Sequence, residues 1–81
     1  SPTTHLCSKG YTDRKEQLTD IVGFVSDKTA TLYINGKKVG TQKADEVHTV
    51  IWKDVRLNAG SNTVELRSAH GSDKATWNVN L

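Results

Sequence analysis

The stretch Ala30-Thr-Leu-Tyr-Ile-Asn-Gly-Lys-Lys-Val-Gly40 contains the signal that decides the fold. Leu32 and Ile34 lie two positions apart, which is the period of a strand with one buried face. Asn35-Gly36 follows directly, and this dipeptide favours a type I′ turn because both central residues need a positive φ. The stretch therefore predicts a β-hairpin, in which residues 37–39 return as the partner strand.

The same two-residue period recurs along the chain, between clusters of Gly, Asn, Asp and Ser. About seven strands, with turns about every eight to twelve residues, are typical of an immunoglobulin-like antiparallel β-sandwich, and we predict that fold. Gly40 is expected to end the return strand, before a polar loop. Besides the hairpin, the predicted strands are residues 20–26, 47–52, 55–57, 63–68 and 75–81, with an edge strand around residues 5–8.

The predicted core takes one face of each strand. The alternation is cleanest in the last strand, where Ala75, Trp77, Val79 and Leu81 share a face, whereas residues 47–52 are apolar on both faces. The predicted core residues are Val22, Phe24, Leu32, Ile34, Val50, Trp52, Val55, Leu57, Val64, Leu66, Ala75, Trp77 and Val79. Asn62 is expected to satisfy backbone groups of the turn that connects two sheets.

Length and composition favour a single domain over residues 1–81, with 35% hydrophobic and 25% charged residues. Residues 1–19 are predicted to be a lead-in strand and charged connector, with a short helical turn as an alternative, and residues 20–81 the sandwich body. The chain begins Ser-Pro and contains no Met, so we expect a segment cut from a larger protein. A dispersed net charge of +2 and the lack of a long apolar run predict neither a nucleic-acid nor a membrane partner.

Several quoted stretches carry a family resemblance. They are Lys9-Gly-Tyr-Thr-Asp-Arg14, Val22-Gly-Phe-Val-Ser-Asp27, Ala30 to Gly40, Val50-Ile-Trp-Lys-Asp-Val-Arg-Leu57 and Asn58-Ala-Gly-Ser-Asn-Thr-Val-Glu-Leu66. Together they resemble the immunoglobulin-like domain near the C-terminus of bacterial family 2 glycoside hydrolases of the β-galactosidase type.

That resemblance implies an accessory domain that packs on, or spaces, a catalytic barrel in an exported enzyme, and therefore a periplasmic or extracellular location. The catalytic carboxylates of such enzymes lie in the barrel, so the resemblance implies no catalytic residue and no cofactor in this chain. Its partners would be the other domains of the parent hydrolase.

The residues themselves also predict no catalytic or metal site. A glycosidase needs two carboxyl groups that flank one bond, but Asp45 and Glu46 are neighbours in a polar loop and Glu65 lies beside Arg67. The three histidines fall in separate segments, without metal-ligand spacing. The single Cys7 excludes both an internal disulfide and a site with several thiolate ligands.

Exposed aromatic rings are the remaining candidates, because sugar-binding modules stack such rings on pyranose faces. Trp52 and Trp77 are predicted to be core, whereas Tyr33 should point outward and Tyr11 lies in the connector. We predict Tyr11 and Tyr33 as contacts for a sugar or for a neighbouring domain. The alternatives to an accessory domain are a carbohydrate-binding module and a cell-surface adhesion or spacer domain.

Overall fold

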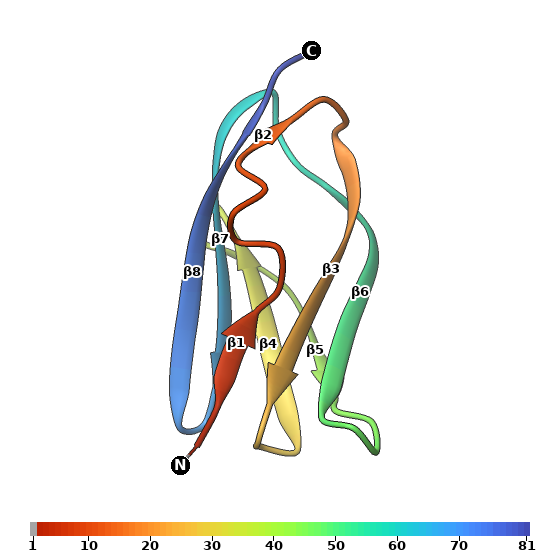
Figure 1. Cartoon of the computed structure of the whole chain (residues 1–81), viewed down its shortest axis with the longest axis vertical. Helices are drawn as coiled ribbons and strands as arrows, with labels where there is room; N and C mark the ends of the chain where they lie inside the picture. The colour runs from red at the N-terminus through yellow and green to blue at the C-terminus, as the bar shows by residue number, and fades with distance from the viewer. Residues whose placement is uncertain (1) are drawn as a thin grey trace.

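Eight strands in two stacked sheets account for most of residues 2–81, which are the residues described by the computed structural model (Figure 1). One sheet has the order β1 (Thr4–Leu6), β3 (Leu18–Val25), β6 (Thr49–Arg56). The other has the order β2 (Asp13–Arg14), β8 (Gly71–Val79), β7 (Gly60–Ser68), β4 (Thr29–Ile34), β5 (Lys37–Lys43). The predicted β-sandwich is confirmed, and it measures 37 × 20 × 20 Å.

The β4–β5 hairpin forms at the predicted dipeptide. Asn35 and Gly36 have φ angles of 53° and 80°, as a type I′ turn requires. The expectation that Gly40 ends the return strand was wrong, because β5 continues to Lys43. β5 is an edge strand and is held by backbone pairing with β4. A hydrogen bond between the hydroxyls of Thr31 and Thr41, at 2.8 Å, adds to that pairing. Because this end of β5 has no alternation of apolar and polar residues, the sequence gave no sign of a strand there.

Most of the predicted core is buried, but the inward face of β3 is the opposite of the one predicted. Ile21 and Val25 are buried, whereas Val22 is half-buried and Phe24 is 43% exposed. Gly23 explains the choice of face, because a Cβ atom there would lie 2.5 Å from Leu66 Cδ2. Only glycine allows β3 to approach the opposite sheet so closely at this position. Ile21 and Val25, each two positions from Gly23, lie on the same face of the strand and therefore point inward.

Other departures from the prediction involve single residues. Leu6 and Ala30 are buried although they were not in the predicted core. Leu81, which was predicted to continue the face of Trp77 in the last strand, is 79% exposed because β8 ends at Val79. Ala75 is only partly buried. The remaining predicted core residues are confirmed as buried: Leu32, Ile34, Val50, Trp52, Val55, Leu57, Val64, Leu66, Trp77 and Val79.

A bulge in β6 joins two segments that were predicted as separate strands. Trp52 pairs with Ile21 and Val55 pairs with Thr19, so two residues of β6 oppose Asp20 alone. Asp54 has a φ of 51°, and its N–H donates to Asp20 Oδ1 at 2.9 Å. The extra residue lets both Trp52 and Val55 point inward although they are three positions apart.

The connector contains no helical turn, so that alternative was wrong. Residues 13–14 form β2, which pairs in parallel with β8 and is the one parallel pairing in residues 2–81. The N–H groups of Asn78 and Asn80 donate to the carbonyl oxygens of Thr12 and Arg14, each at 2.7 Å. The connector's backbone groups are satisfied by β8 rather than by a helix. No membrane-spanning helix is found between residues 2 and 81.

Asn62 is fully buried and holds the β6–β7 corner, as predicted. Its Nδ2 donates to the carbonyl oxygens of Asn58 at 2.8 Å and Gly60 at 3.0 Å, and its Oδ1 accepts the Asn58 N–H at 2.8 Å. The same Oδ1 accepts from Asn35 Nδ2 at 3.1 Å, and Asn35 Oδ1 accepts the N–H of Thr63. One amide therefore connects the corner to the β4–β5 hairpin.

Candidate functional site

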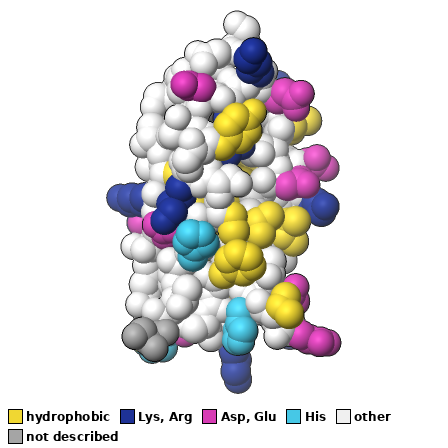
Figure 2. All heavy atoms as spheres, in the orientation of Figure 1, with side chains coloured by type: hydrophobic (Ala, Val, Ile, Leu, Met, Phe, Trp, Pro, Cys, Tyr) yellow, Lys and Arg dark blue, Asp and Glu magenta, His cyan; other side chains and the backbone are white. Residues whose placement is uncertain are grey.

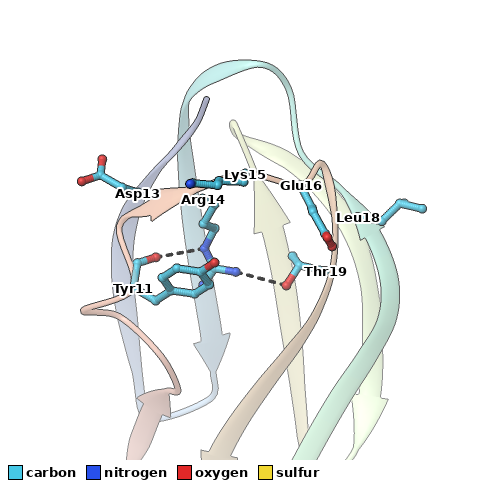
Figure 3. Close-up of a pocket in the computed structure, with 7 residues that line it drawn as sticks. All are labelled: Tyr11, Asp13, Arg14, Lys15, Glu16, Leu18 and Thr19. Carbon is cyan, nitrogen blue, oxygen red and sulfur yellow. Dashed lines mark hydrogen bonds between the residues drawn. The ribbon is translucent and has the colours of Figure 1, made fainter. Parts of the chain in front are cut away.

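A stack of three side chains lies where the connector meets the last strand. The guanidinium carbon of Arg14, on β2, lies 3.6 Å from the centroid of the Trp77 ring and 4.4 Å from that of the Tyr11 ring. Figure 3 shows the Tyr11 ring beside the Arg14 side chain. A desolvated cation–π contact is worth about 2 kcal/mol, and Arg14 is only 5% exposed. The stack therefore ties the connector to β8.

Two hydrogen bonds orient the guanidinium, shown as dashed lines in Figure 3. Nε donates to the Tyr11 carbonyl oxygen at 2.9 Å, and Nη1 donates to the Thr19 hydroxyl at 3.1 Å. No carboxylate between residues 2 and 81 forms an ion pair with Arg14. Burial lowers the pKa of Arg14, and the electrostatic influence of the nearby Tyr11 partly opposes this effect. Arginine nevertheless stays protonated in proteins, so the stack holds a fixed positive charge.

An open hollow of about 410 Å³ lies beside two members of this stack, Tyr11 and Arg14. Asp13 points away from the guanidinium, on the far side of β2 (Figure 3). From the sequence we identified Tyr11 but not Arg14. The available sign was an arginine three positions after a tyrosine, in a connector with few apolar residues that could hold it to the sandwich. The lining residues are Tyr11, Asp13, Arg14, Lys15, Glu16, Leu18 and Thr19.

We expect replacement of Arg14 by lysine to destabilise the domain by about 1–2 kcal/mol, because lysine keeps the charge but loses the planar stack and the fork of donors. Arg56→Lys is the matched control, since Arg56 is exposed and should change stability by less than about 0.5 kcal/mol. Urea unfolding of both variants measures the difference. Equal midpoints for the two variants would contradict a clamping role for Arg14.

Tyr33, the second predicted contact residue, lies elsewhere, on the outer face of the five-stranded sheet. It pairs with Glu65 across the β4–β7 ladder, and the Arg67 guanidinium carbon lies 4.3 Å from its ring centroid. Arg67 Nη2 also donates to Glu65 Oε1 at 2.9 Å, which lowers the pKa of Glu65. One face of the Tyr33 ring is therefore covered by Arg67. The predicted contact of Tyr11 and Tyr33 with a sugar or another domain stays a prediction.

Two loop carboxylates, those of Asp27 and Asp45, hold backbone segments together. Asp27 Oδ1 lies 2.6 Å from His70 Nδ1, and this hydrogen bond lowers the pKa of Asp27. Asp45 Oδ1 accepts the N–H groups of Val47 and Thr49. Each contact joins a strand end or a turn to a neighbour, which is a structural use of the charge.

Asp73 is likewise engaged, at the start of β8. Its Oδ2 lies 2.7 Å from Lys9 Nζ and accepts the N–H of Leu6 at 2.8 Å. Burial raises the pKa of Asp73, but these hydrogen bonds outweigh burial and the net shift is downward. Cys7 is half-buried, and burial raises the pKa of its thiol. Within residues 2–81 no three His, Cys, Asp or Glu side chains are grouped as metal ligands.

The fold and these contacts define a small β-sandwich whose polar side chains mainly connect its own segments. Comparison with known proteins shows that the chain is similar to part of glycoside hydrolases. The chain is 34% identical over 65 residues to a β-glucuronidase of Bacteroides fragilis, covering 80% of this chain and 9% of that protein. No protein-family model matches the sequence.

Solved structures show the same relationship over almost the whole chain. The FMN-binding β-glucuronidase of Faecalibacterium prausnitzii L2-6 matches 99% of this chain and 12% of its own, with a TM-score of 0.87 and 29% identity. A putative β-galactosidase from B. fragilis shares the fold with a TM-score of 0.85 and 22% identity, over 99% of this chain and 13% of its own. The predicted resemblance to a small domain of family 2 glycoside hydrolase chains is confirmed.

Proposed function

We propose that this chain is a non-catalytic, immunoglobulin-like accessory domain of a bacterial family 2 glycoside hydrolase of the β-galactosidase type, which packs on or spaces the catalytic barrel. One observation carries the proposal: the chain matches chains of such enzymes over almost its full length but accounts for only 9% to 13% of theirs. Most of the polypeptide in these relatives therefore lies outside the matched region.

The arrangement of the carboxylates supports a non-catalytic role. A retaining glycosidase needs two carboxyl groups about 5–5.5 Å apart on either side of one bond. Here Glu65 is bonded to Arg67, Asp27 to His70 and Asp73 to Lys9, on three different parts of the sandwich. The parent would be an exported enzyme, in the periplasm or outside the cell, as the family resemblance of the sequence implies.

The sugar-binding alternative has weaker support from the two tyrosines. Stacking on a pyranose needs a free aromatic face, and Arg67 covers one face of Tyr33 while Arg14 covers one face of Tyr11. The two rings also lie in different settings, the connector and the outer face of β4. We therefore favour contact with other domains of the parent over independent binding of carbohydrate.

The gene that encodes the chain provides the first test. We expect the open reading frame to contain a catalytic barrel with two well-spaced glutamates. Tandem sandwich domains without a barrel would overturn the proposal in favour of an adhesion or spacer role.

Deletion of the domain from the parent enzyme provides the second test. We expect the truncated enzyme to have a lower Tm than the parent and to keep measurable turnover, because the barrel retains the carboxylates. Alanine at one barrel glutamate is the control, and it should abolish turnover without this loss of Tm. A truncated enzyme with unchanged Tm and activity would count against an accessory role.

A further inference from the structure

The outer face of the three-stranded sheet carries an apolar patch, which we call the β3–β6 patch: Val22 and Phe24 of β3, Ile51 of β6 and the adjoining Val47. Val22 and Ile51 are directly opposed across the ladder, and Phe24 is opposed by His5 of β1. Figure 2 shows hydrophobic side chains gathered over β3 and β6. Contiguous exposed apolar side chains of this kind mark interaction surfaces.

The outer face of the other sheet is different in kind. There Glu65, Arg67 and Tyr33 contact one another, and the hydroxyls of Thr31 and Thr41 are bonded. Such a face is suited to water, because its polar groups are paired and its largest ring is partly covered by a charged group. The two faces of the sandwich are therefore not equivalent, and the apolar patch is confined to one of them.

Parts of β3 and β6 have the sequence of strands that are covered on both faces. Residues 21–25 and 50–52 are continuous apolar runs, whereas a strand with one wet face alternates apolar and polar residues. This explains why the inward face of β3 was predicted wrongly. In our interpretation, Val22 and Phe24 are large apolar residues, like those of a core, because another part of the parent protein covers them.

The patch also has the anatomy of an interface. A shallow hollow of about 290 Å³ lies beside Phe24 and Val47, where a partner's apolar side chain could insert. Polar groups flank the patch: His5 stacks against Phe24, and the Lys53–Asp20 ion pair at 3.6 Å spans β6 and β3. An apolar centre with a polar rim is the usual arrangement of a protein interface.

We infer that the β3–β6 patch is the face that docks on the rest of the parent hydrolase, against an uncharged, apolar surface of a neighbouring domain. The inference rests on the proposed function. A protein surface fits better than a sugar, because the patch is built from aliphatic side chains and its one aromatic ring already stacks on His5. We place the partner within the same polypeptide because this chain covers only 9% to 12% of the matched hydrolase chains, which leaves most of each chain to form neighbouring domains.

Cysteine labelling in the full-length parent enzyme tests this face. Ile51→Cys places a thiol in the patch, and Val39→Cys is the matched control on the edge strand β5, since the two side chains are 39% and 45% exposed. Both variants carry Cys7→Ser, and labelling is read by mass spectrometry of the two peptides. We expect position 51 to react at least about tenfold more slowly than position 39, because a docked face must open first.

Equal labelling rates at the two positions would overturn the inference. Protection that disappears on dilution would also overturn it, in favour of a second copy of the chain, as would protection that appears only with added oligosaccharide. These outcomes are separate from failure of the proposed function, which the reading frame decides beforehand. A parent with a barrel but with equal labelling would retain the accessory role and exclude this docking face.

Discussion

Replacing Asn62 by alanine is expected to destabilise the domain by about 3 kcal/mol, because an unsatisfied buried donor or acceptor costs about 1–3 kcal/mol. Alanine would leave the Asn58 N–H and the carbonyl oxygens of Asn58 and Gly60 without their side-chain hydrogen-bond partner. It would also release Asn35, which connects the corner to the β4–β5 hairpin. A domain of this size has a total stability of roughly 4–12 kcal/mol, so the loss is a large share of it.

Urea unfolding, followed by Trp fluorescence, measures this effect. Asn80→Ala is the matched control, because Asn80 is exposed and its side chain bonds only the amide of half-buried Asn78. The control should stay within about 0.5 kcal/mol of the unsubstituted chain. If Asn62→Ala unfolded at the same urea concentration as the control, the corner would not depend on the buried amide.

Gly23→Ala is expected to cost about 2–3 kcal/mol through overpacking, which is the upper part of the range for inserting a methyl group into a filled core. The added Cβ would lie 2.5 Å from Leu66 Cδ2 and 3.0 Å from the carbonyl oxygen of His5. The leucine terminus can rotate, but the carbonyl belongs to the β1 backbone. The substitution should therefore push β1 away from β3.

Gly10→Ala is the matched control for this prediction, since a Cβ at position 10 meets no atom within 4 Å. It should leave the unfolding midpoint almost unchanged. Hydrogen exchange at the N–H of Cys7, which donates to the Val22 carbonyl, reports the β1–β3 contact directly. Gly23→Ala with unchanged stability and unchanged exchange there would show that the added methyl group is accommodated without displacing β1.

Sequence reasoning reached the sandwich because its strongest signals are local. The Asn35-Gly36 turn requires two positive φ angles, and the alternation in residues 63–68 and 75–79 reflects one wet and one buried face. β5 beyond Gly40 could not be predicted in this way, because an edge strand is specified by the backbone of its neighbour. The bulge at Asp54 was also hidden, since it appears only when β3 and β6 are aligned.

The candidate site was less predictable than the fold. Tyr11 could be identified as an aromatic residue in a polar connector, but its partner Arg14 gains its position from Trp77, more than sixty residues away in the sequence. The face of β3 was ambiguous because both of its faces are apolar. Gly23 was the available signal, since a glycine within an apolar strand often marks a close approach of another backbone.

The parallel pairing of β2 with β8 has a consequence for the order of folding. Residues 13–14 are synthesised early, but their partners at residues 78–79 leave the ribosome only after every other strand. Until then Trp77, the ring on which Arg14 stacks in the folded domain, is not available to it. Pairings between residues far apart in the sequence tend to form late and to slow folding. We therefore expect the burial of Trp77 beneath Arg14 to be the step that completes the domain, and a change in Trp77 fluorescence would report it.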